Sequence, residues 1–130
     1  MSSILINFSG HTLCKDAVEI LTKKYELIIN SDPIVFDFDG EIDVQISDVF
    51  MRIPHVLDGS VPLAIIPPGQ STLAILLVSY LHGIIGHFPL ICYLQMSENG
   101  LYLPRAEYTI SPQFIRTSGR KYRTTMFKTS

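Results

Sequence analysis

The chain has 130 residues, which suits a single domain, and 47% of them are apolar whereas only 17% are charged. This composition excludes a disordered chain and a coiled coil, and two cysteines are too few for a disulfide scaffold. Residues 1–107 carry five basic and twelve acidic side chains, whereas residues 108–130 carry five basic side chains and no acidic one. Within the acidic part, residues 59–97 contain no charged side chain at all.

The uncharged stretch is not expected to be a membrane helix. A spanning helix needs about 20 unbroken apolar residues, but Pro, Pro, Gly and Gln at 67–70 interrupt the stretch and the run over 73–85 is too short. The start of the chain lacks the basic region of a signal peptide. We therefore expect a cytoplasmic protein without a membrane partner, and the two cysteines suit a reducing compartment.

Hydrophobic periodicity predicts strands that alternate with helices along the first 110 residues. The expected strands are 3–8, 27–30 with an extension over 34–38, 61–66, 90–95 and 101–108, the last an edge strand interrupted by Pro104. The expected helices are 13–25, 42–53 and 73–85, with a side-chain cap from Thr12 for the first and from Ser71 or Thr72 for the third.

This order predicts an α/β fold. We expect one Rossmann-like domain over residues 1–110, with a mostly parallel open sheet flanked by helices, and a basic tail over residues 111–130. In such sheets, ligands bind outside the carboxyl ends of the strands, next to helix N-termini. Two loops meet this description: residues 7–11 after the first strand and residues 67–72 after the third.

The loop over residues 67–72 is a candidate anion site. Gly69 allows a ligand close to the backbone, and Ser71 and Thr72 place hydroxyls at a helix N-terminus, where free N–H groups and the helix dipole favour phosphate. The loop has neither the GxxxxGK[ST] pattern nor the GxGxxG pattern of the common nucleotide-binding folds. An ordinary strand–helix connection with a Ser/Thr cap explains the same residues equally well, so both interpretations stay open.

The loop after the first strand carries Asn7, Ser9 and His11. Asparagine can read a base edge or a phosphate, and a histidine can act as an acid or base near neutral pH. The alternative is a simple turn with a solvated imidazole. His82 and His87 are five residues apart and do not share a helix face, and no Cys, His or carboxylate cluster has zinc spacing, so we expect neither a metal nor a cofactor.

Asp37 and Asp39 lie in the run Phe-Asp-Phe-Asp-Gly, which resembles the nucleophile loop of the haloacid-dehalogenase phosphatases. That motif continues with Thr or Val, whereas Glu41 follows here. No later carboxylate before Glu98 stands at an expected strand end. We interpret the run as a solvated acidic turn and keep a phosphatase centred on Asp37 and Asp39 as a subordinate alternative.

The basic tail mixes Arg120, Arg123 and further cations with Tyr122 and Phe127, a combination that suits phosphates and bases. A solvated terminus is the alternative. Because residues 1–107 are acidic, we expect no long nucleic acid as a partner. A local clamp over a small anion, or over the acidic face of a partner, fits the charge distribution better.

Several motifs together resemble one known family. They are the opening Ile4–Ser9 with His11, the run Pro67-Pro68-Gly69-Gln70-Ser71, and the pair Leu81-His82-Gly83 and Gly86-His87-Phe88-Pro89. These are similar to the small type III CRISPR-associated proteins of the Csx series, family fifteen. The resemblance extends from the first strand to about Pro89 and does not include the tail.

The resemblance implies a CARF-like homodimer that binds a cyclic oligoadenylate, the second messenger of this antiviral defence. Cyclic tetra-adenylate, a two-fold symmetric ring, would fit across a two-fold dimer axis. Such proteins either sequester the ring as a sponge or cleave it slowly without a metal as a ring nuclease, for which His11 and Ser71 are the catalytic candidates. The implied ligand-binding residues are Asn7, Ser9, His11, Gly69, Gln70, Ser71 and Thr72, and the basic tail adds Arg120 and Arg123 as candidates.

A different class of function stays open beside this one. The chain would then be a Rossmann-like dimeric interaction module that docks a partner through its basic tail.

Overall fold

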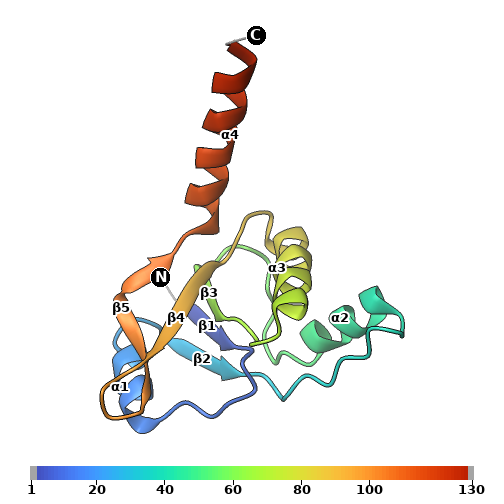
Figure 1. The fold of residues 1–130 in the computed structure, drawn as a ribbon. Helices are drawn as coiled ribbons and strands as arrows, with labels where there is room; N and C mark the ends of the chain where they lie inside the picture. The colour runs from blue at the N-terminus through green and yellow to red at the C-terminus, as the bar shows by residue number, and fades with distance from the viewer. Residues whose placement is uncertain (1–2, 129–130) are drawn as a thin grey trace.

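The computed structural model describes residues 3–128, without the side chains of residues 105–109 and 128. Its elements, in chain order, are β1 (Ile4–Asn7), α1 (Lys15–Thr22), β2 (Leu27–Asn30), α2 (Ile42–Met51), β3 (Leu63–Ile66), α3 (Ser71–Ile85), β4 (Leu90–Met96), β5 (Tyr102–Ile110) and α4 (Pro112–Lys128). Strands and helices alternate as far as β4, as the hydrophobic periodicity predicts (Figure 1).

The five strands form one sheet in the order β2-β1-β3-β4-β5. β1 pairs in parallel with β2 and β3, β3 pairs in parallel with β4, and the edge strand β5 is antiparallel to β4. The predicted α/β class with a mostly parallel, Rossmann-like sheet is therefore confirmed. The chain passes from β1 to β2 and then crosses to the other side of β1 to form β3, so the winding direction changes between β1 and β3.

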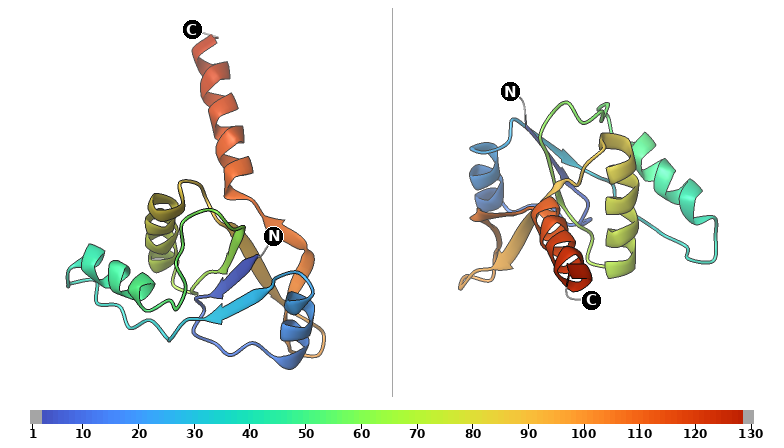
Figure 2. Two further views of the ribbon diagram at one scale, coloured as in Figure 1. Left: turned by 180° about the vertical axis from the view of Figure 1, so that it is seen from behind. Right: turned by 90° about the horizontal axis from the view of Figure 1, so that it is seen from above.

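Helices cover both faces of this sheet (Figures 1 and 2). On one face α2 and α3 enclose the larger core, to which Ile6, Phe50 and Leu77 belong. On the other face α1 packs over a smaller core that includes Leu5 and Leu21. β1 and β3 are buried at every position, as central parallel strands covered on both sides must be.

The uncharged residues 59–97 include β3, α3 and β4. One stripe of α3 is buried, with Leu73, Leu77, Leu81 and Ile85 facing the sheet. Burying each leucine of this stripe contributes about 2 kcal/mol, which explains why a charge-free stretch suits this place. Among the helices of residues 3–128, none combines the length and the apolar character that crossing a membrane requires.

The caps of two helices differ from the prediction. Thr12 lies too early to cap α1, which begins after Cys14, and the side chain of Cys14 makes no capping bond. α3 is capped by Gln70 and not by a hydroxyl of residues 71–72, because the longer amide side chain reaches back to a backbone N–H of the first turn. Both helices therefore begin close to the predicted places, α1 without a side-chain cap and α3 with a cap from another side chain.

The basic tail is a helix, α4, that projects away from the body of the molecule (Figures 1 and 2). Ser111 starts it by accepting the Phe114 N–H at 3.3 Å, and Pro112 occupies the first helical position, where its missing N–H is not needed. β5 runs back along β4, so that Ile110 lies opposite Ile91 near the start of that strand. α4 consequently begins at the amino-terminal edge of the parallel strands.

Candidate ligand-binding edge of the sheet

The winding direction changes between the carboxyl ends of β1 and β3, which are adjacent in the sheet. From this point residues 8–14 lead to α1 on one face, and residues 67–70 lead to α3 on the other. The Phe8 N–H donates to the Ile66 carbonyl at 2.9 Å and holds the two strand ends together. Loops that diverge at such a switch point leave a crevice, the usual ligand site of open α/β sheets.

Asn7 ends β1 with a buried side chain that is only 2% exposed. Its Nδ2 donates to the His11 carbonyl at 2.9 Å and to the Asn30 Oδ1 at 3.1 Å. Its Oδ1 accepts the Ser9 N–H at 3.0 Å and the Ser9 hydroxyl at 2.6 Å. Because these contacts occupy both ends of the amide, Asn7 shapes the loop and is not free to read an adenine edge.

Ser9 and His11 lie on the loop that Asn7 organises. Ser9 is half-buried, and its Oγ also accepts the His11 N–H at 3.2 Å. The described hydrogen bonds of His11 all involve its backbone, and its side chain is exposed to solvent. The imidazole therefore stands at the carboxyl edge of the sheet without a described group that orients it.

The N-terminus of α3 follows β3 at the same edge of the sheet as the loop after β1. Gln70 Oε1 accepts the Leu73 N–H at 2.6 Å, and the first intrahelical bond runs from the Ala74 N–H to the Gln70 carbonyl. Helix geometry leaves the N–H groups of Ser71 and Thr72 without an intrahelical acceptor. Residues 69–72 are exposed, and a Cβ added at Gly69 would meet nothing within 4 Å, so an anion can approach these donors.

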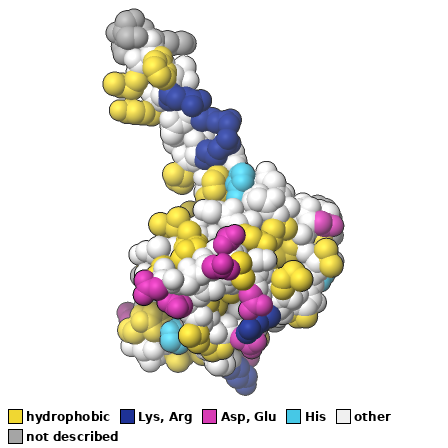
Figure 3. All heavy atoms as spheres, turned by 90° about the vertical axis from the view of Figure 1, so that its right-hand side faces the viewer, with side chains coloured by type: hydrophobic (Ala, Val, Ile, Leu, Met, Phe, Trp, Pro, Cys, Tyr) yellow, Lys and Arg dark blue, Asp and Glu magenta, His cyan; other side chains and the backbone are white. Residues whose placement is uncertain are grey.

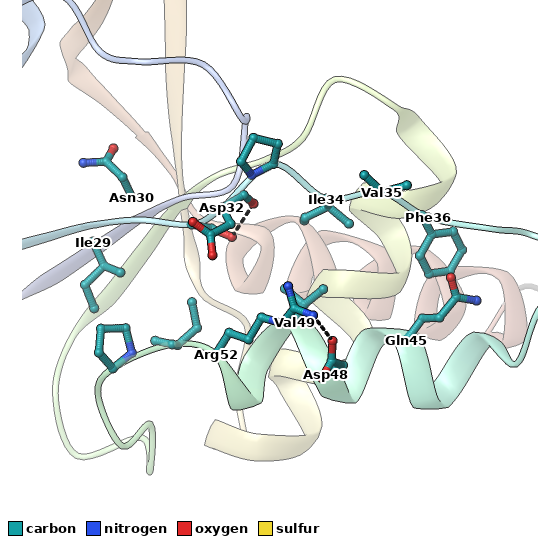
Figure 4. Close-up of a pocket in the computed structure, with 14 residues that line it drawn as sticks. Ile29, Asn30, Asp32, Ile34, Val35, Phe36, Gln45, Asp48, Val49 and Arg52 are labelled. Carbon is teal, nitrogen blue, oxygen red and sulfur yellow. Dashed lines mark hydrogen bonds and ion pairs between the residues drawn. The ribbon is translucent and has the colours of Figure 1, made fainter.

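A hollow of about 420 Å³ lies next to this edge, between the end of β2, residues 31–36 and α2 (Figure 4). Its apolar wall includes Ile34 and Val49, and its polar groups include Asn30 and Arg52. The Arg52 guanidinium contacts the Asp48 carboxylate at 2.9 Å, with both side chains more than half exposed. Since exposed pairs contribute at most about 1 kcal/mol, an incoming anion can compete with Asp48 for Arg52.

Sequence reasoning missed Asn30 and Arg52 as site residues. The signal for Asn30 was present: asparagine ends both β1 and β2, and parallel pairing places Asn7 directly beside Asn30. No comparable signal marks Arg52, which comes to the hollow only because α2 folds back beside the end of β2.

The predicted site residues fall into two groups. The structure brings Asn7, Ser9 and His11 to the same edge of the sheet as residues 69–72. It does not bring Arg120 and Arg123 there, because they belong to α4, which leaves from the opposite edge. His82 also lies away from the site, near the C-terminus of α3, where its ring packs against Phe88 with centroids 4.5 Å apart.

The acidic run around Asp37 is a turn, as its sequence indicates. The Asp37 carboxylate accepts the Asp39 N–H at 3.0 Å, and the Gln45 side chain bonds both the N–H and the carbonyl of Asp37. These bonds hold residues 34–38 in a loop, so the expected extension of the second strand is wrong. Across the described part of the chain, no group of three or more Cys, His, Asp or Glu residues is arranged to hold a metal ion.

No family model matches this chain, and no curated protein or solved structure matches it either. The geometry of this edge and the motifs at its loops are therefore the features that bear on function.

Proposed function

We propose that the protein binds a cyclic oligoadenylate at the carboxyl edge of its sheet and so lowers the free concentration of this type III CRISPR messenger. The observation that carries the proposal is the open N-terminus of α3 at the switch point, beside the loop of Ser9 and His11. The resemblance of the motifs at these loops supplies the ligand class.

A phosphate of the ring would meet the N–H groups of Ser71 and Thr72 and their two hydroxyls. An adenine would enter the hollow beside β2, whose 420 Å³ lie within the usual range of small-molecule pockets. Arg52 would then provide the positive charge near the phosphates, a role predicted from the sequence for Arg120 and Arg123. In this arrangement Asn7 acts indirectly, by holding Ser9 and the His11 backbone in place.

Sequestration is the activity that we propose first, with slow cleavage as its extension. Cleavage would need the ribose 2′-hydroxyl held in line with its own phosphate and a proton donor for the leaving oxygen. His11 and Ser71 are the candidates for that donor. Efficient transfer requires a positioned donor, whereas the described contacts of His11 hold only its backbone.

Two further parts of the proposal concern assembly and place. A ring with four phosphates presents two equivalent halves, which suits a homodimer with one edge from each copy. A cytoplasmic location suits two free cysteines and a messenger that is made inside the cell.

Titration calorimetry with cyclic tetra-adenylate on the full chain tests the proposal. We expect stoichiometric binding. Ser9→Tyr should block it sterically, because the larger phenol side chain would occupy the space beside the N-terminus of α3. Ser71→Ala should weaken binding only modestly, about threefold to tenfold, since it removes one hydroxyl donor and leaves the backbone N–H donors in place. Ser79→Tyr is the matched control, because residue 79 is exposed on the same helix about 12 Å further along its axis.

The outcomes separate the activities. No binding at micromolar ligand overturns the proposal, and binding that survives Ser9→Tyr shows that the ligand uses another surface. Multiple turnover to linear products indicates a ring nuclease, and His11→Ala should then abolish turnover while it spares binding. Intact ligand recovered after prolonged incubation indicates a sponge.

A further inference from the structure

Helix α4 projects away from the body of the molecule (Figure 1). Its described side chains from Gln113 to Phe127 are exposed, among them Ile115 at 61% and Tyr122 at 68%. Helical spacing aligns Ile115, Gly119, Tyr122 and Met126 into one stripe, which is apolar apart from the glycine. Arg116 and Arg123 lie along one edge of this stripe, whereas Lys121 lies on the far side of the helix.

A helix of this kind is not expected to persist alone in water. Short isolated helices are marginal even in alanine-rich sequences, and the sequence of α4 contains a glycine, three threonines and five basic residues but no acidic residue. Several hydroxyls are turned back onto the helix; those of Thr117 and Ser118, for instance, donate to carbonyls four residues earlier. The helix therefore needs a surface that covers its apolar stripe.

A groove between α2 and α3 has the complementary character. Two adjoining hollows of about 670 and 500 Å³ share Met51 and Tyr80. Met51 is 81% exposed, and Val44 and Val56 extend the apolar floor.

Acidic side chains line one side of this groove. Asp43 and Asp48 border it, and residues 32–58 carry seven acidic side chains against one arginine. The space-filling view shows acidic side chains among the apolar patches on one face of the body and a row of cations along α4 (Figure 3). The groove thus has an apolar floor with acidic side chains beside it, which complements an apolar stripe with cations beside it.

We infer that α4 of one copy docks into the α2–α3 groove of a second copy. The stripe of Ile115 and Tyr122 covers Met51 and Val44, while Arg116 and Arg123 meet the acidic side of the groove. Charge complementarity selects this occupant. Residues 108–130 carry five basic and no acidic side chains, whereas the groove belongs to residues 32–58 and α3, where acidic side chains predominate. If two copies exchange helices reciprocally, the assembly closes as a two-fold dimer.

Sedimentation equilibrium of the full chain without any ligand tests this inference. The wild-type chain should form dimers at micromolar concentration. Arg116→Glu with Arg123→Glu should raise the dissociation constant at least about tenfold, because both charges then repel the groove. Thr117→Glu, Lys121→Glu and Thr124→Glu together change the net charge by the same amount on the far side of α4 and should change the constant less than about threefold.

A mixing experiment makes the test specific. Asp43→Lys with Asp48→Lys should also prevent self-association, whereas Glu19→Lys with Glu26→Lys, on the α1 side of the molecule, should not. The helix variant and the groove variant, each monomeric alone, should form a heterodimer when mixed, because every helix then meets a groove of opposite charge. Thermal unfolding of each variant checks that the body still folds.

Three results would overturn the inference: a monomeric wild-type chain, a far-side triple variant that disrupts association as strongly as the pair at Arg116 and Arg123, or no heterodimer on mixing. A monomeric chain that instead binds a single-stranded oligonucleotide through α4 would assign the helix to nucleic acid. None of these results decides whether the ring binds at the carboxyl edge, so the two proposals fail separately.

Discussion

Asn7 shows how one buried side chain can shape a whole loop. Its single amide joins the end of β1 to Asn30 on β2, to Ser9 and to the backbone of His11. A polar group at 2% exposure is tolerated because each of its hydrogen-bonding ends has a partner. The residue that sequence reasoning assigned to the ligand is therefore one that positions the residues around it.

Replacing Asn7 should destabilise the protein more than replacing a residue that it holds. Asn7→Ala leaves several partners unsatisfied and should lower the free energy of unfolding by about 2–4 kcal/mol. Ser9→Ala removes only the hydroxyl contacts and should cost about 1 kcal/mol. Urea unfolding measures both values. Asn7→Asp keeps the acceptor but loses both donated bonds, and wild-type stability for that variant would contradict the assigned network.

Gly59 marks a second position where one residue type is required. Its φ is +83°, and a Cβ there would lie 2.5 Å from the Ile85 carbonyl oxygen at the end of α3. Gly100 has a similar φ of +78° with nothing within 4 Å of the same added atom. Alanine substitutions at these two glycines therefore separate the cost of backbone strain, which both share, from the cost of a steric clash, which only Gly59 has.

We expect Gly100→Ala to cost about 1 kcal/mol, the strain alone, and Gly59→Ala about 3 kcal/mol or more, since the carbonyl cannot move without disturbing α3. Thermal and urea unfolding provide the comparison. Equal losses for the two variants would show that residues 56–62 shift to accept the methyl group.

At the scale of an element, the start of α3 combines a structural cap with a candidate anion site. Gln70 satisfies one N–H of the first turn and leaves the earlier ones to solvent or to a ligand. A substitution that keeps the cap but changes the charge can therefore distinguish stability from binding.

Gln70→Asp and Gln70→Asn are such a pair, equal in size and both good caps. Either variant should unfold within about 1 kcal/mol of the wild type. The aspartate should weaken ring binding at least about tenfold relative to the asparagine, because a carboxylate at the helix N-terminus competes with phosphate for the same donors. Calorimetry on both variants measures the difference, and equal affinities would remove the α3 N-terminus from the site.

For the molecule as a whole, the sequence predicts the layers well and their contacts less well. The periodicities of β1, β3 and α3 predict their places because burial alone determines those patterns. The cap by Gln70 and the loop held by Gln45 escape prediction, since each depends on a side chain that reaches back to the backbone.

The candidate site was predictable only in part. Its loops follow from the fold class, because parallel strands bring their carboxyl ends to one edge. The separation of Arg120 and Arg123 from that edge does not follow, because it depends on the antiparallel return of β5. A local pattern cannot show the direction in which an edge strand runs.

That return has an electrical consequence. By carrying the cationic segment to one pole of an otherwise anionic particle, β5 gives the molecule a large permanent dipole moment. Two approaching copies would orient each other electrostatically before they touch. A small polyanion would be attracted by the basic end of the molecule and repelled by the acidic end. Salt screens this long-range interaction, because the Debye length of the solution shortens as the ionic strength rises. The association rate of the protein with a charged partner should therefore fall as the ionic strength increases.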